Sequence, residues 1–229
     1  MIMKGSGKVM ALEFDSPKIL DEIQRSVYNA VKPYGFRRHG RSLHRFVDGD
    51  ISQVIAFQLG PSYLEWNHQL SVNVGIRVPE CMARSFTPEE KPKKYYKEYE
   101  CNIRSRLGKV EGKEEACYDL RQPAEPILAD ILRQLADVVL PAFAVLNSRE
   151  AILAHRREYP DFDLLNDHLI LLEEAMIFGR RGEADRAAEC FQSYYRLCAA
   201  GQLSQKDPRV IRNHLQYVEQ LAQRLGIPL

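Results

Sequence analysis

Apolar and polar residues alternate along two neighbouring stretches in the first half of the chain. The clearer stretch is 68–78, where the apolar positions are Leu70, Val72, Val74, Ile76 and Val78 and the positions between them are Ser71, Asn73, Gly75 and Arg77. A period of two places one set on a buried sheet face and the other set towards solvent. Residues 51–59 alternate more loosely, and 48–50 (Asp-Gly-Asp) is a tight-turn signal. The pattern therefore predicts antiparallel strands at 42–47, 51–59 and 68–78.

The alternation returns over 99–107, which predicts a fourth strand with one charged, wet face. Residues 116–120 are a candidate for a short fifth strand. Between these strands, 79–97 contains three prolines and a cluster of lysines, a composition typical of a loop or excursion.

Helical periodicity dominates the rest of the chain. An apolar stripe follows Pro17 and ends at Pro33 and Gly35, and from Pro123 a wide apolar face predicts a long helix that is bent or ended near Pro141. Further helices are predicted at 164–178, at 184–200 and from about 207 to 226.

Strands that come first and helices that follow favour an α+β fold over an alternating parallel fold. We predict an antiparallel sheet of four to five strands packed by an N-terminal helix and a long helix, followed by a C-terminal helical bundle or hairpin. The predicted organisation is a loose leader at 1–14, an α+β domain at 15–147, and a helical extension at 148–229. That extension either packs on the domain or forms a small second domain.

Composition narrows the functional classes only slightly. The 229 residues carry a formal net charge of +1, so the chain as a whole has no strong attraction to nucleic acid or to acidic membranes. Five cysteines without framework spacing favour free thiols, and no apolar run is long enough for a secretory signal or a membrane helix. We therefore expect a cytoplasmic protein.

The densest positive charge lies just after the first predicted helix. It comprises Arg37, Arg38, His39, Arg41, His44 and Arg45. Such a cluster binds phosphates or an acidic protein surface, but charges also discourage pairing at a sheet edge. No aromatic residues are interleaved within the cluster, unlike in single-strand binding surfaces.

Two further features are candidates for binding. Lys93 and Lys94 lie beside tyrosines in the predicted loop. This loop is either simply solvated or binds a partner. Trp66, the only tryptophan, either caps the core or anchors an interface. The predicted binding residues are Arg37, Arg38, Arg41, Arg45, Trp66, Lys93 and Lys94.

The charged face of the predicted sheet is a separate candidate site. It comprises Asn73, Arg77, Arg104 and Arg106. Arginine pairs bind phosphate or carboxylate in a bidentate manner, although a charged outer face is normal for an antiparallel sheet. The sequence predicts no catalytic residue, no metal ligand and no cofactor, because it contains no Gly-x-Ser-x-Gly, no Cys-x-x-Cys and no phosphate loop.

Four segments together resemble a known type of bacterial domain. They are Gly-Phe-Arg-Arg at 35–38, the strand at 53–58, Val-Asn-Val-Gly-Ile at 72–76, and Cys-Asn-Ile-Arg-Ser-Arg-Leu-Gly at 101–108. With the flanking helices, they make residues 15–146 similar to an uncharacterised family among the domains of unknown function. The family shows GFxR, QxIxFQ, VNxGI and CxIRxRLG segments. The resemblance implies a compact α+β domain and supplies no reaction.

Our leading hypothesis is a non-enzymatic, cytoplasmic protein-binding module of bacterial type, for which an immunity protein is an analogy at the level of fold class. The partner is then another protein. The alternatives are an accessory factor that binds nucleic acid through the basic patches, and an enzyme whose site is the polar sheet face. Sequence leaves the oligomeric state open.

Overall fold

The structure is a computed structural model that describes residues 15–60, 68–81, 94–114, 117–162, 167–200, 208–224 and 226–227. The predicted leader lies outside the described residues, as do 82–93 of the predicted excursion.

The first helix, α1 (Ser16–Val31), begins where the sequence predicts. The carboxylate of Asp15 accepts a hydrogen bond from the backbone N–H of Lys18 at 3.0 Å, and Pro17 occupies the first turn, where its missing N–H costs nothing. Most of the apolar stripe is buried, with Leu20 and Val27 fully covered, whereas Tyr34 just after the helix is exposed. Gly35 has a positive φ of 89° and closes the short 3-10 turn Lys32–Tyr34 that follows the helix.

Six strands form one antiparallel sheet in the described part of the chain. They are β1 (Arg37–His39), β2 (Ser42–Val47), β3 (Ile51–Leu59), β4 (Gln69–Arg77), β5 (Ile103–Arg106) and β6 (Cys117–Asp119). The order is β1-β2-β3-β4-β5, and β6 pairs with β4 beyond the end of β5. The predicted α+β class is confirmed. The sheet gains β1, which is too short for alternation to reveal, and β5 is shorter than predicted because Glu98–Glu100 forms a 3-10 turn.

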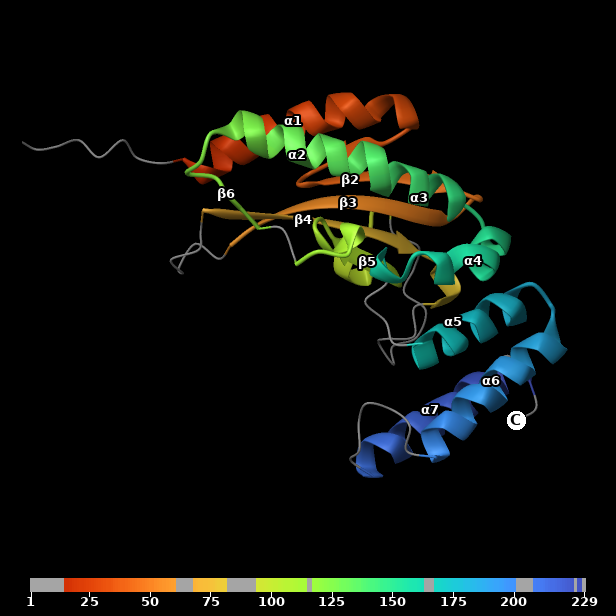
Figure 1. Cartoon of the computed structure of the whole chain (residues 1–229). Helices are drawn as coiled ribbons and strands as arrows, with labels where there is room; N and C mark the ends of the chain where they lie inside the picture. Colours follow the sequence, from red (N-terminus) through yellow and green to blue (C-terminus); the bar gives the residue numbers. More distant parts are fainter. Residues whose placement is uncertain are drawn as a thin grey trace, which may run out of the picture.

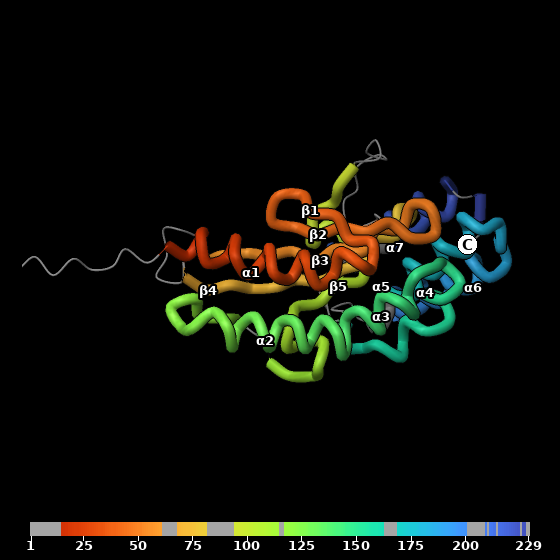
Figure 2. Tube along the Cα trace, turned by 90° about the horizontal axis from the view of Figure 1, so that it is seen from above, coloured from red at the N-terminus to blue at the C-terminus, as the bar shows by residue number. Residues whose placement is uncertain are grey.

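Two helices lie side by side on one face of the sheet (Figures 1 and 2). They are α1 and the long helix formed by α2 (Ala124–Gln134), the π-helical turn Leu135–Val139 and α3 (Leu140–Val145). The N–H of Leu140 reaches back five residues to the carbonyl of Leu135, next to Pro141, which has no N–H to donate. The helix therefore passes Pro141 through a π-helical turn and ends at Val145.

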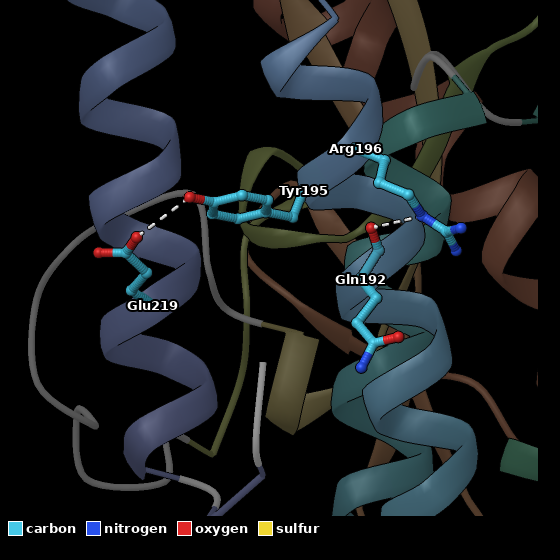
Figure 3. Close-up of a pocket in the computed structure, with 4 residues that line it drawn as sticks. All are labelled: Gln192, Tyr195, Arg196 and Glu219. Carbon is cyan, nitrogen blue, oxygen red and sulfur yellow. Dashed lines mark hydrogen bonds between the residues drawn. The ribbon is translucent and has the colours of Figure 1, made fainter.

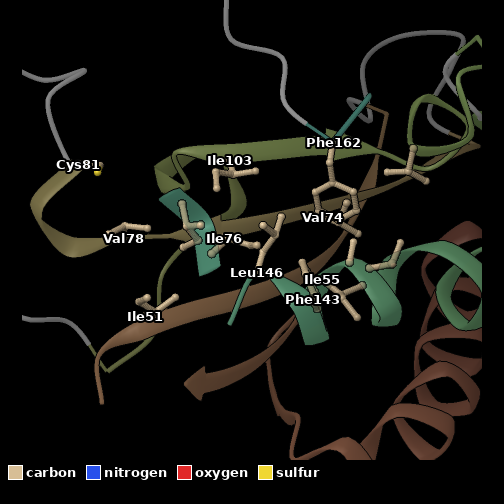
Figure 4. Packing of buried hydrophobic residues seen from close by; sticks show 14 of the residues in the cluster. Ile51, Ile55, Val74, Ile76, Val78, Cys81, Ile103, Phe143, Leu146 and Phe162 are labelled. Carbon is tan, nitrogen blue, oxygen red and sulfur yellow. The ribbon is translucent and has the colours of Figure 1, made fainter. Parts of the chain in front are cut away.

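The core fills the space between this helical layer and the sheet (Figure 4). Ile55 and Val74 face each other across β3 and β4 and are fully buried. Phe143 stacks on Phe36 at 6.2 Å between ring centroids and meets Phe162 edge-on at 5.6 Å. The amide of Gln53, which points to the same side, donates to the carbonyl of Phe143 at 2.7 Å.

In the described part of the chain, four more α-helices follow the long helix: α4 (Arg149–His155), α5 (Asp167–Arg180), α6 (Ala184–Ala199) and α7 (Pro208–Arg224). The sequence predicted the last three but not α4. α5 packs against the 3-10 turn Pro79–Cys81, where the buried guanidinium of Arg156 bonds the buried carboxylate of Glu173 at 2.6 Å. α6 lies between α5 and α7 (Figure 1).

The buried apolar residues of α5, α6 and α7 belong to the same connected cluster as those of the sheet. Among the described residues, no helix combines the length and the apolar character that crossing a membrane requires.

Candidate functional site

The basic cluster predicted from the sequence forms a hairpin, which we call the basic hairpin and define as residues 37–47. β1 and β2 pair with Arg37 opposite His44 and His39 opposite Ser42. The two-residue connection starts with Gly40 at φ 56°, a positive value that suits a tight hairpin turn. Arg37, His39 and His44 therefore share the sheet face away from α1, and Arg38 lies on the helical side.

Arg45, one of the four predicted binding arginines, has a structural role. Its guanidinium donates to the side-chain oxygen of Gln53 and to the carbonyl of Tyr34, and it lies 5.0 Å above the ring of Phe36. Partial burial lowers its pKa. Arg45 thus fastens the hairpin to the core.

The other three arginines of the basic hairpin are exposed. Arg38 lies 4.0 Å from Asp21 of α1, the weak limit of an ion pair, and within the described part of the chain Arg37 and Arg41 have no ion-pair partner. Residues 37–47 contain no Asp or Glu. The acidic turn beyond them offers no compensation, since Asp48 and Asp50 both bond Arg149. The hairpin therefore presents uncompensated positive charge.

The polar sheet face predicted from the sequence is assembled by strand register. Asn73 lies opposite Arg106, and Gly75 opposite Arg104, across β4 and β5. The Nε of Arg106 donates to the side-chain oxygen of Asn73 at 2.8 Å. The structure therefore brings Asn73, Arg104 and Arg106 together, with Arg77 next along β4.

The prediction of a wet face was wrong for Asn73 and Arg77, whereas Arg104 and Arg106 are half-buried. Asn73 is 3% exposed and Arg77 is 6% exposed, because residues 94–101 cross the face of the sheet. We call this segment the strap. Periodicity along one strand could not reveal it, since the cover comes from a different part of the chain.

Three side chains of the strap contact three different strands of the sheet. Tyr95 stacks on His39 of β1 with ring centroids 3.9 Å apart, and Tyr96 lies 3.7 Å from the guanidinium carbon of Arg77 in β4. Glu98 lies 3.6 Å from Arg104 in β5. The strap thus joins the two clusters that the sequence predicted separately, and it places Lys94, next to Tyr95, beside the basic hairpin.

Burial shapes the electrostatics under the strap. The pKa of His44 is lowered to about 4 by burial and by the neighbouring His39, so His44 is neutral at pH 7. Burial raises the pKa of Glu98, and Arg104 and Arg106 oppose that shift. The Nε atoms of Arg77 and Arg104 are buried without a hydrogen-bond partner in the described structure.

Two predicted binding residues, Trp66 and Lys93, lie outside the described residues. Three residues that the sequence did not single out for binding, Tyr95, Tyr96 and Glu98, hold the strap on the sheet. Their only signal in the sequence is the aromatic pair beside the lysines.

A pocket of about 480 Å³ lies between α6 and α7 (Figure 3). Tyr195 donates from its hydroxyl to Glu219 at 3.4 Å across the two helices, and the Nε of Arg196 donates to the carbonyl of Gln192 at 3.3 Å. Sequence reasoning missed these residues, because charged and polar side chains on exposed helical faces carry no special pattern.

The fold and site define an α+β domain with two helices on one sheet face and a strap on the other. The chain belongs to the family described as domain of unknown function (DUF4304), whose model matches residues 27–145. The match covers the sheet, most of its helical layer and the basic hairpin. Neither the comparison with curated proteins nor that with solved structures gave a significant match.

Proposed function

We propose that the chain is a non-enzymatic binding protein that docks an acidic surface of another protein on its basic hairpin. The observation that carries this proposal is the exposed charge of Arg37 and Arg41, which have no ion-pair partner within the described residues and lie on a short, rigid hairpin. Arg45 anchors the hairpin to Gln53 and Tyr34, so few degrees of freedom are lost on binding. A toxin neutralised by its immunity protein is one example of such a partnership.

The hairpin also offers apolar contact area beside its charges. Tyr34, just before the hairpin, is 53% exposed and Phe46 is 46% exposed, and both lie towards its open end, away from the turn. Arginine and aromatic residues are enriched where proteins bind each other, whereas lysine is depleted. This composition favours a protein partner.

The stacking of the strap argues against nucleic acid as the main ligand. Proteins that bind single strands use free aromatic faces as platforms for bases. Here one face of Tyr95 is occupied by His39 and one face of Tyr96 by Arg77. The polar sheet face is likewise engaged in internal contacts, which favours a structural role for Asn73, Arg77, Arg104 and Arg106 over a substrate site.

A comparative pull-down from native cells tests the proposal. The tagged wild-type protein is compared with an Arg37→Glu/Arg41→Glu variant and with an Arg180→Glu/Arg212→Glu control, which makes the same charge change on exposed positions of α5 and α7. We expect one stoichiometric acidic protein with the wild type and the control, and its loss with the hairpin variant. Equal capture by all three proteins, or capture of nucleic acid alone, would refute the proposal.

A further inference from the structure

The basic hairpin also supplies an edge strand of the sheet, to which a partner can attach. In the described structure, β1 is the first strand in the order and pairs with β2 alone. At the opposite end, β5 packs against the turn Pro160–Phe162, and the hydroxyl of Ser105 in β5 donates to the carbonyl of Asp161 at 2.7 Å. An end strand presents backbone N–H and C=O groups that can template another strand.

The charges on β1 restrict which strand can pair there. Arg37 and His39 project from one face, Arg38 from the other, and Arg41 lies in the adjoining loop. A second copy of this chain would place the same cations opposite one another, which is unfavourable for directly opposed cross-strand pairs. An acidic strand would place carboxylates opposite them instead, which is favourable.

The edge is also held in a fixed shape. On the sheet face away from α1, the ring of Tyr95 stacks on that of His39 with centroids 3.9 Å apart. The carbonyl of Gly40 accepts a hydrogen bond from the side-chain amide of Gln24 in α1 at 2.9 Å. The strand and its turn are therefore tied to the strap and to α1. A partner strand meets a preformed edge and does not have to order it.

We infer that the partner binds as an extended acidic segment that adds a strand to the sheet along β1. This inference rests on the proposed function, and it specifies backbone pairing where the proposal requires only charge. β1 has three residues, so the backbone contributes few hydrogen bonds. An ion pair to Arg37, which has no ion-pair partner within the described residues, then supplies much of the affinity.

A synthetic octapeptide that alternates glutamate and valine provides the probe. Its affinity for the full chain is measured by fluorescence anisotropy. Two further forms of the peptide are measured in the same way: one carries N-methyl groups on the backbone amides of one strand edge, at alternate residues, and the other carries them on the opposite edge. These peptides keep the same charge and side chains. We expect binding to weaken about tenfold when the pairing edge is methylated and to change little when the other edge is methylated.

The outcomes separate this inference from the proposed function. Equal binding of all three peptides would overturn strand addition while leaving a charge-based docking site intact. Absence of binding by the glutamate peptide, or equal binding of a lysine–valine peptide or an oligothymidylate, would also overturn the inference. In each case the pull-down still decides the proposed function. Selective slowing of amide exchange in β1 on addition of the peptide would support the inference and locate the pairing.

Discussion

Gly75 shows how a single residue allows the strap to cover the sheet. A Cβ atom at this position would lie 2.7 Å from the Cβ of Cys101 and 3.2 Å from the carbonyl oxygen of Ile103, closer than side chains pack. The alternation that revealed β4 could not show why a glycine stands here. The reason is the close approach of a segment that lies 26 residues further along the chain.

Replacing Gly75 by alanine should destabilise the fold. The added methyl group meets the Cβ of Cys101 and a backbone oxygen, neither of which can move away at low cost, so we expect a loss of about 1–3 kcal/mol. Urea denaturation followed by circular dichroism measures the change. The control is Ser71→Ala, on the same face of β4, with an expected effect within about 0.5 kcal/mol. Unchanged stability of the Gly75 variant would show that the strap does not lie on β4.

His44 should make stability depend on pH in a narrow window. Its folded pKa of about 4 lies below the value of about 6.5 in an unfolded chain, so between these values the unfolded chain binds more protons. Its stabilising contribution is therefore fully present above about pH 6.5 and is lost as the pH falls towards 4. We expect a loss of about 1–3 kcal/mol over this range.

The measurement is the free energy of unfolding at several pH values for the wild type and for His44→Gln. The difference between the two curves isolates His44 from the other titrating groups. Parallel curves between pH 4 and pH 6.5 would contradict the buried, neutral state of this side chain.

At the scale of elements, periodicity predicted the helices and strands whose pattern lies within one segment. It missed the features that depend on contacts with a distant segment. The helices α1, α5, α6 and α7 and the strands β2, β3 and β4 follow from the spacing of their apolar residues, which pack in the common core. β1 was missed because its residues are all exposed. The strap was missed because its tyrosines are held by residues of β1 and β4, and no local pattern records such contacts.

The attachment of α5 depends on a buried ion pair. Glu173→Ala should destabilise the protein by about 3–5 kcal/mol, because it leaves the guanidinium of Arg156 buried without this carboxylate. Thermal unfolding of the variant measures the effect. The control Arg121→Ala breaks an exposed pair with Asp119 and should leave the melting temperature nearly unchanged. A Glu173→Ala variant as stable as its control would mean that α5 does not pack as described.

For the whole molecule, the continuous apolar cluster predicts cooperative unfolding. The cluster joins the sheet to α5, α6 and α7 through residues such as Phe162, Leu172 and Phe191, so the family domain and the C-terminal helices share one core. Calorimetry of the full chain should show one transition, with equal calorimetric and van't Hoff enthalpies. Two separated transitions would show that the C-terminal helices unfold on their own.

The central claim is that the basic hairpin is the docking surface for an acidic protein. The most direct measurement is the dissociation constant of the captured partner for the wild type, for Arg37→Glu/Arg41→Glu and for the Arg180→Glu/Arg212→Glu control, at one fixed salt concentration. We predict that the hairpin variant binds at least about tenfold more weakly while the control matches the wild type. A hairpin variant that binds as tightly as the wild type would contradict the claim and move the docking surface elsewhere on the molecule.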